Sequence, residues 1–207
     1  MMKQALTYIL IFIAMSVHAQ HNKIDEEHEN FFRFGVKAGV NINKVQGQSF
    51  NEKYNFNYQL GGFVQFNFSK RFGIQPEINF VQSRSEFSND ASDVYNDLFR
   101  DGTQKKAKLN QIEIPVLLNI NLGESKRIKL QAGPVYGKVL NQTSDSLITS
   151  LTLYKQNEWS IAGGIWMQFP LIYLGGRYKY GLTNINNIDS RESWKNQAIQ
   201  LFLGLTF

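Results

Sequence analysis

The chain of 207 residues contains no cysteine. Without cysteine no disulfide framework can form, although the compartments that receive exported proteins would permit one. No cysteine follows the apolar N-terminal run either, so the processed chain cannot carry a lipid anchor on such a residue. These absences exclude the disulfide-stapled domain and the lipoprotein anchored through cysteine.

Histidine is nearly as scarce, because the three residues of this type, His18, His21 and His28, all lie near the N-terminus. A mechanism built on a Ser-His or Asp-His pair therefore has no base in the body of the chain, which disfavours an outer-membrane lipid hydrolase. The acidic residues between positions 86 and 101 lack the spacing of a calcium-binding loop. We expect no enzymatic activity, no metal site and no cofactor.

Long hydrophobic runs are missing beyond the N-terminus, and the mean hydropathy is −0.31. Aromatic residues make up 14% of the chain and glycine occurs 16 times, which suits short strands and excludes a helical membrane protein. The formal net charge of +5 is scattered along the sequence, so it does not indicate a nucleic-acid partner.

Residues 1–19 have the features of a secretory signal peptide. Lys3 supplies a positive start, residues 5–17 form an apolar run, and Val17-His18-Ala19 matches a small-x-small cleavage site. The run is too short for a spanning helix. We predict cleavage after Ala19, followed by a polar, flexible periplasmic leader over 20–32.

The remaining sequence alternates apolar and polar residues with the period of two that is typical of β-strands. In its last segment the odd positions from 199 to 207 are apolar, and the even ones are small or polar apart from Phe202. Most segments reach the roughly 9–11 residues that a tilted strand needs to cross a membrane. The eight expected strands are 33–43, 56–68, 72–82, 107–122, 128–140, 159–169, 171–182 and 195–207.

The connections between these segments alternate strictly in length. Short ones lie at 69–71, 123–127 and around Pro170, whereas those at 44–55, 83–106, 141–158 and 183–194 are long. Short periplasmic turns alternating with long outer loops are typical of an up-and-down barrel. The sequence thus predicts an all-β protein, an eight-stranded antiparallel transmembrane β-barrel over residues 33–207.

Several strand motifs resemble those of the PorT-like outer-membrane β-barrel family of Bacteroidetes, a porin-like group. They are GVKAGVNI at 35–42, FGIQPEINF at 72–80, QIEIPVLL at 111–118, QAGPVYG at 131–137 and RYKYGLTNI at 177–185. The resemblance implies location in the cell outer membrane. The family's namesake takes part in secretion of gingipain-type proteases, but no residue here singles out that member.

The terminal strand resembles the end of bacterial outer-membrane barrels, where the last strand closes against the first. This resemblance implies that Leu203, Leu205 and Phe207 form a signal read by the barrel-assembly machinery. Three prolines, Pro76, Pro115 and Pro134, fall inside expected strands. Because a closed barrel has no edge where a missing N–H is harmless, we predict β-bulges at these positions.

Six charged residues fall on the mixed faces, which point inward if the apolar faces meet lipid. An eight-stranded barrel is filled by side chains and has no open pore. Opposite charges inside it are predicted to pair as a structural plug. Arg177, with its planar fork, is the expected bridge to Glu113 and Glu77. The six residues are Lys37, Glu77, Glu113, Lys129, Arg177 and Lys179.

The expected role is that of a structural or interaction scaffold acting through the outer loops, with outer-membrane lipid and lipopolysaccharide around the barrel. An unknown extracellular or secretion-system protein is a further possible partner. The apolar candidates for contact in the second long loop are Phe87, Tyr95, Leu98 and Phe99. One alternative is a secreted lipocalin-like carrier with its apolar faces turned inward; a lesser one is an accessory factor of a secretion system.

Overall fold

The computed structural model describes residues 31–47, 54–86, 106–123, 127–143, 154–188 and 193–207. The predicted signal peptide and leader fall almost entirely outside these ranges. In the described ranges no helix is long and apolar enough to span a membrane.

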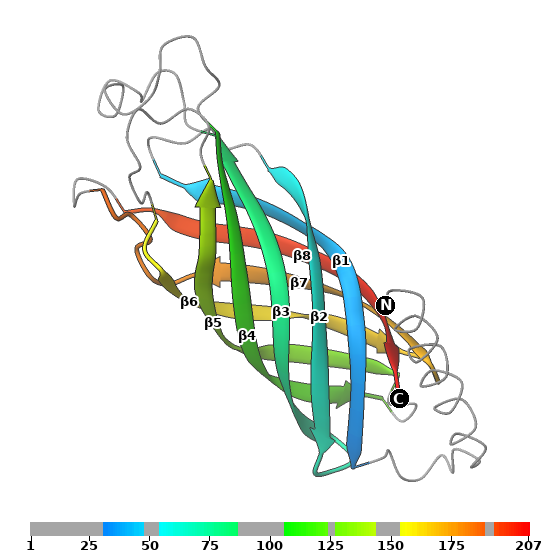
Figure 1. Cartoon of the computed structure of the whole chain (residues 1–207). Helices are drawn as coiled ribbons and strands as arrows, with labels where there is room; N and C mark the ends of the chain where they lie inside the picture. The colour runs from blue at the N-terminus through cyan, green and yellow to red at the C-terminus, as the bar shows by residue number, and fades with distance from the viewer. Residues whose placement is uncertain (1–30, 48–53, 87–105, 124–126, 144–153, 189–192) are drawn as a thin grey trace, which may run out of the picture.

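The described residues form eight strands that close into a single antiparallel barrel in chain order, as Figure 1 shows. The last strand pairs with the first from Gly35↔Thr206 to Gln46↔Lys195. This confirms the predicted fold. The strands are β1 Phe32–Gln46, β2 Asn55–Asn67, β3 Phe72–Glu86, β4 Lys106–Leu122, β5 Ile128–Thr143, β6 Asn157–Gln168, β7 Ile172–Gly181 and β8 Lys195–Thr206.

The two ends of the barrel differ. One end, called here the turn end, holds the start of β1, the end of β8 and the short β2–β3, β4–β5 and β6–β7 connections. In the first of these turns the Ser69 hydroxyl oxygen accepts the backbone N–H of Phe72 at 2.8 Å. The other end, the loop end, holds the long connections.

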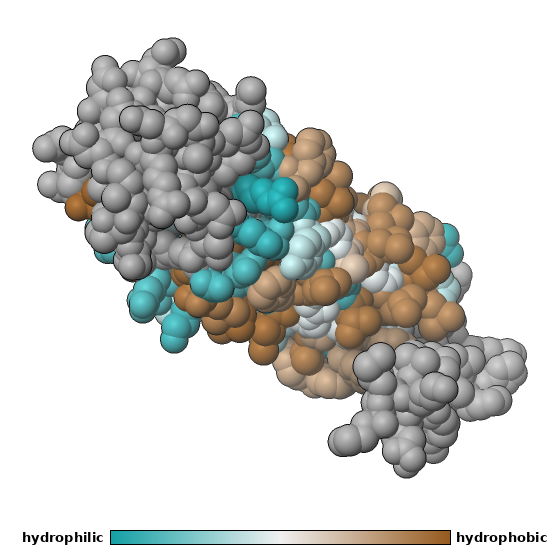
Figure 2. Space-filling view, turned by 45° about the horizontal axis from the view of Figure 1, so that its top comes forward, coloured by the Kyte–Doolittle hydropathy of each residue, from teal (hydrophilic) through white to brown (hydrophobic). Residues whose placement is uncertain are grey.

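The alternation of each strand places apolar side chains outside and polar ones inside. Leu118 is 42% exposed on the outer wall, whereas its neighbour Asn119 is 1% exposed in the lumen. Hydrophobic residues form a broad brown band around the visible face in Figure 2. A lipocalin-like carrier requires the opposite arrangement, an apolar interior and a polar exterior, so that alternative is wrong.

The prediction of bulges at the prolines is also wrong. The β3–β4 register runs unchanged from Pro76↔Val116 to Asn79↔Glu113, and the β4–β5 register from Pro115↔Val135 to Leu118↔Ala132. Pro134 pairs with Ile161 in regular register. A proline removes a hydrogen bond but adds no residue, so the strands stay aligned past it. The register shift between β4 and β5 lies instead between Asn110 and Gln111.

Two adjacent glycines of β6 give a test of how tightly the wall packs. A Cβ at Gly164 would lie 2.2 Å from the Gly176 carbonyl oxygen and 2.7 Å from Arg177 Cα, whereas one at Gly163 would meet Gln131 O at 3.8 Å. Gly164→Ala should therefore lower the free energy of unfolding by about 1–3 kcal/mol, because backbone must shift. Gly163→Ala is the matched control and should be close to neutral. Denaturant titration in detergent micelles measures both, and equal effects would contradict the packing.

Candidate functional site

The lumen of the barrel contains three of the four acidic side chains in the described ranges, and Glu77 on β3 lies at its centre. Lys37 Nζ of β1 lies 2.6 Å from Glu77 Oε2. Arg177 of β7 donates through both terminal nitrogens, at 3.0 Å to each carboxylate oxygen. Gln75 and Asn79 donate amide N–H groups at 2.8 and 3.0 Å. We call these five residues the Glu77 network.

The second acidic side chain, Glu113 on β4, has a separate set of partners. Lys179 of β7 lies 2.5 Å from Glu113 Oε1. Gln111 and Gln200 donate to the two carboxylate oxygens at 2.7 and 3.0 Å. These four residues and Glu158, described next, form the Glu113 network.

The prediction that Arg177 bridges both carboxylates is therefore confirmed for Glu77 and wrong for Glu113. Arg177 and Lys179 both point inward from β7, two positions apart, and each meets a different carboxylate. The Arg177 guanidinium also donates to Gln131 Oε1 at 2.9 Å. Its bidentate contact with Glu77 agrees with the fork geometry expected of arginine.

Glu158, at the start of β6, completes the second network and was missed from sequence. It is 2% exposed, and its Oε1 lies 3.8 Å from Lys179 Nζ. Ser160 donates to it at 2.9 Å and Asn196 at 3.3 Å. The sequence predicts a strand that begins at residue 159, which leaves Glu158 in the preceding connection. Glu158 has an even residue number, as do Ser160 and Trp166, whose side chains point into the lumen. This alternation along the strand could have identified Glu158 as a lumen residue.

Lys129 of β5, the remaining predicted lumen cation, is also fully enclosed, with 0% exposure. It lies toward the turn end, opposite Asn121 on β4 and Trp166 on β6. All six predicted lumen residues are thus inside the barrel, each at 3% exposure or less.

An aromatic layer fills the lumen on the turn-end side of the Glu77 network. Trp166 and Tyr173 stack with centroids 4.0 Å apart, and Phe63 meets both rings edge-on. Phe202 completes the layer, with Lys37 Nζ 4.6 Å and the Arg177 guanidinium 5.0 Å from its ring centroid. The cations of the network are therefore held between the Glu77 carboxylate and the face of the Phe202 ring.

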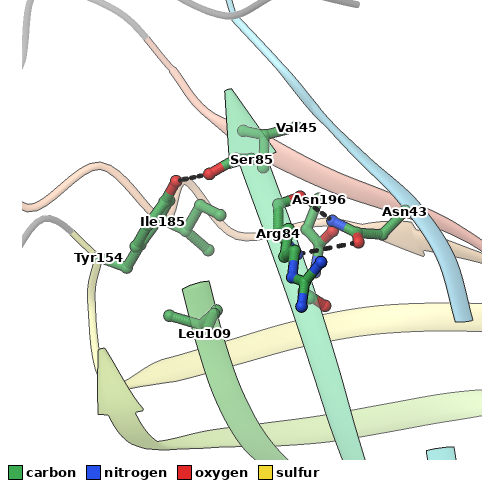
Figure 3. A pocket seen from close by; sticks show the side chains of 9 residues that line it. Asn43, Val45, Arg84, Ser85, Leu109, Tyr154, Ile185 and Asn196 are labelled. Carbon is green, nitrogen blue, oxygen red and sulfur yellow. Dashed lines mark hydrogen bonds between the residues drawn. The ribbon is translucent and has the colours of Figure 1, made fainter. Parts of the chain in front are cut away.

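The loop end of the lumen is narrowed by residues of the long connections (Figure 3). Tyr154 forms a hydrogen bond with Ser85, drawn in Figure 3. The Tyr154 ring also packs edge-on against Trp194, with centroids 5.8 Å apart. Burial raises the pKa of the Tyr154 phenol above its ordinary range, although the bond to Ser85 opposes the shift. The cavity beside it measures about 10 Å³, room for no more than about one water molecule.

The described residues do not bring together three or more histidine, cysteine or acidic side chains that could hold a metal. The carboxylates in the two networks are already occupied by cations and amides. What this arrangement can do chemically is seal the lumen with fixed charge pairs.

The other predicted contact residues divide into two groups. Phe87, Tyr95, Leu98 and Phe99 lie outside the described residues. Leu203 and Leu205 face outward at 58% and 45% exposure. Phe207 lies against Phe34 at the seam, with ring centroids 5.6 Å apart and backbone hydrogen bonds of 2.8 and 3.3 Å between the two residues.

A closed eight-stranded barrel with an apolar outer wall and a polar, sealed lumen defines a small outer-membrane β-barrel protein. The chain belongs to the family described as outer membrane protein beta-barrel domain, whose sequence model matches residues 18–187. Its place is therefore the outer membrane. Among curated proteins no match was found.

Solved structures with the same fold share little sequence. Ail, the attachment invasion locus protein of Yersinia pestis, in complex with the heparin analogue sucrose octasulfate, is 13% identical, with a TM-score of 0.50 over 86% of this chain and 100% of Ail. Outer membrane protein OprG from Pseudomonas aeruginosa is 12% identical, with a TM-score of 0.51 over 88% of this chain and 98% of OprG. At this identity the likeness concerns the fold alone.

Proposed function

We propose that this protein is a sealed scaffold that presents its loop end outside the cell and binds a partner there. The observation that supports this role best is the blocked lumen. From the turn end to the loop end, the aromatic layer, the Glu77 network and the Glu113 network lie one after another along it, and their charged side chains are at most 3% exposed. Solute passage would require separating ion pairs whose members would then be buried without partners.

A rigid barrel suits the display of loops, because binding residues are commonly carried on loops held by a stable frame. Phe87, Tyr95, Leu98 and Phe99 remain the apolar contact candidates. The partner class that fits them is an extracellular or secretion-system protein. No catalytic role is proposed, since the described carboxylates are all engaged in ion pairs or amide contacts within the lumen networks or lie at the rim.

Two finer assignments belong to this proposal. The strand motifs support membership of the PorT-like branch of the family, and with it an accessory role in protein secretion. The outward Leu203 and Leu205 and the seam residue Phe207 support a terminal strand read by the barrel-assembly machinery after a signal peptide is removed at Ala19. Deletion of the gene, followed by a comparison of the secreted proteins, tests the secretion role.

Reconstitution into liposomes tests the sealed lumen. The purified protein should give no solute flux above that of protein-free liposomes, whereas a general porin at the same density should give a large flux. A solute flux comparable to that of the porin would contradict the proposed scaffold role and would favour a channel.

Substitution of the loop candidates tests the display role. Replacing Phe87, Tyr95, Leu98 and Phe99 together by serine should abolish binding of cell-surface or secretion partners identified by cross-linking. The heat-dependent shift of the folded barrel on SDS gels should persist, which separates lost binding from lost folding. Unchanged binding would place the contact elsewhere.

A further inference from the structure

The outer wall of β3 and β4 changes from apolar to cationic over a short distance near the loop end. The outward positions of the two strands are apolar up to the paired residues Phe80 and Ile112. The next pair is Gln82 and Asn110, where the Gln82 amide donates to Asn110 Oδ1 at 3.2 Å and Gln82 itself is buried. Beyond it stand Arg84 and Lys108, directly opposite each other.

This change marks the level at which lipid chains give way to headgroups. The outward apolar run on β4 extends from Ile112 to Leu122. At about 3.4 Å per residue and about 40° of tilt it covers about 26 Å along the membrane normal, close to the height of the apolar band of an outer-membrane barrel. Figure 2 shows hydrophilic residues gathered beside the brown band toward one end. Arg84 and Lys108 therefore lie at headgroup level.

Two like charges placed directly opposite on neighbouring strands repel each other, since their Cβ atoms are only about 4.5–5.5 Å apart. Within the described ranges no acidic side chain forms a salt bridge with Arg84 or Lys108. The Arg84 backbone is fixed, because its N–H donates to Asn43 Oδ1 at 3.2 Å and its carbonyl accepts from Asn43 Nδ2 at 2.9 Å (Figure 3). The strands thus hold two cations side by side in a place that an anion would stabilise.

Two other cations at the same end have a different environment. Lys44 Nζ lies 5.3 Å from the centroid of the Tyr54 ring, and Lys195 Nζ lies 5.6 Å from that of Tyr180. The Arg84–Lys108 pair has no ring of this kind among the described residues.

We propose that Arg84 and Lys108 form a binding site on the outer wall for a phosphate group of lipopolysaccharide. The outer leaflet is built largely of this glycolipid, and its phosphates lie where the acyl chains end, at the level of the pair. The arginine fork binds two phosphate oxygens and the lysine ammonium adds a second charge. This proposal rests on one part of the proposed function, namely that the loop end faces the outside of the cell. It does not depend on what the long loops bind.

Binding of lipid A to the purified full-length protein in detergent tests the site. Phosphorylated lipid A should bind the Arg84→Gln/Lys108→Gln variant roughly tenfold or more weakly than the unchanged protein, since the variant lacks both cations that attract the charged lipid. The matched control is Lys70→Gln/Arg71→Gln, which removes the same two charges from the exposed β2–β3 turn. It should bind as the unchanged protein does.

Three results would overturn the proposal. These are an equal loss in the control variant, equal binding of lipid A stripped of its phosphates, and equal binding of phosphatidylglycerol. Solute flux through the barrel in the liposome experiment would contradict the sealed scaffold but would not contradict this phosphate site. The two proposals can therefore be tested separately.

Lys108→Glu separates binding from folding. The change replaces a like-charge pair by an opposite-charge pair, so the lipid-free barrel should be at least as resistant to denaturant as before. Lipid A binding should nevertheless fall at least as far as in the double variant. Retained binding in this folded protein would contradict the site.

Discussion

Glu77→Ala is expected to lower the free energy of unfolding of the barrel by on the order of 3–5 kcal/mol, the usual cost of removing one member of a buried ion pair. Glu77 accepts both Arg177 contacts at 3.0 Å and the Lys37 contact at 2.6 Å, so its loss leaves two cations without their carboxylate. Guanidinium titration of the refolded protein in detergent micelles, followed by tryptophan fluorescence, measures the effect.

A double-mutant cycle identifies the partner. Combining Glu77→Ala with Arg177→Ala should cost less than the sum of the two single changes, because the pair is removed as a unit. Combining Glu113→Ala with Arg177→Ala is the control, and it should be closer to additive, since Glu113 binds Lys179 instead. Additivity for Glu77 with Arg177, together with coupling for Glu113 with Arg177, would refute the pairing seen in the lumen.

The second large effect concerns the lipid-facing wall. Leu118 lies near the middle of the apolar run of β4, and Leu118→Arg should reduce stability by about 2–4 kcal/mol, because a charge at the bilayer midplane is poorly solvated. Leu122→Arg is the matched control on the same strand and face, with 41% exposure against 42%, but at the turn end. There the cost should fall to about 0–1 kcal/mol. Refolding yield into lipid vesicles and denaturant titration measure both.

Equal costs at Leu118 and Leu122 would mean that the bilayer does not surround β4 as the apolar run indicates. Asn119 makes a poorer control than its inward position suggests. It donates to Gln75 Oε1 at 2.9 Å and accepts from Gln131 at 2.8 Å, so even a polar replacement there loses hydrogen bonds worth roughly 1 kcal/mol each.

Some of this molecule could be predicted from sequence because the signals are local. Alternation such as Gln111 to Leu118 reflects the pleat of one strand, so the inward and outward faces follow without knowledge of any neighbour. Alternating connection lengths gave the strand order, since short turns join only adjacent antiparallel strands. Each lumen charge could be assigned to the interior on the same local basis.

What the tertiary structure alone decided is which residues meet across the barrel. Arg177 and Lys179 lie on the same face of β7, yet Arg177 binds Glu77 and Lys179 binds Glu113. The stagger between strands sets the position of each side chain along the barrel axis, and so decides which carboxylate it meets. The same holds for Glu158, whose role appears only once β6 is placed beside β7. The stacking of Trp166 on Tyr173 likewise depends on pairing between strands. A strand's own pattern contains no information on stagger, and for this reason the partners, unlike the faces, could not be read from the chain.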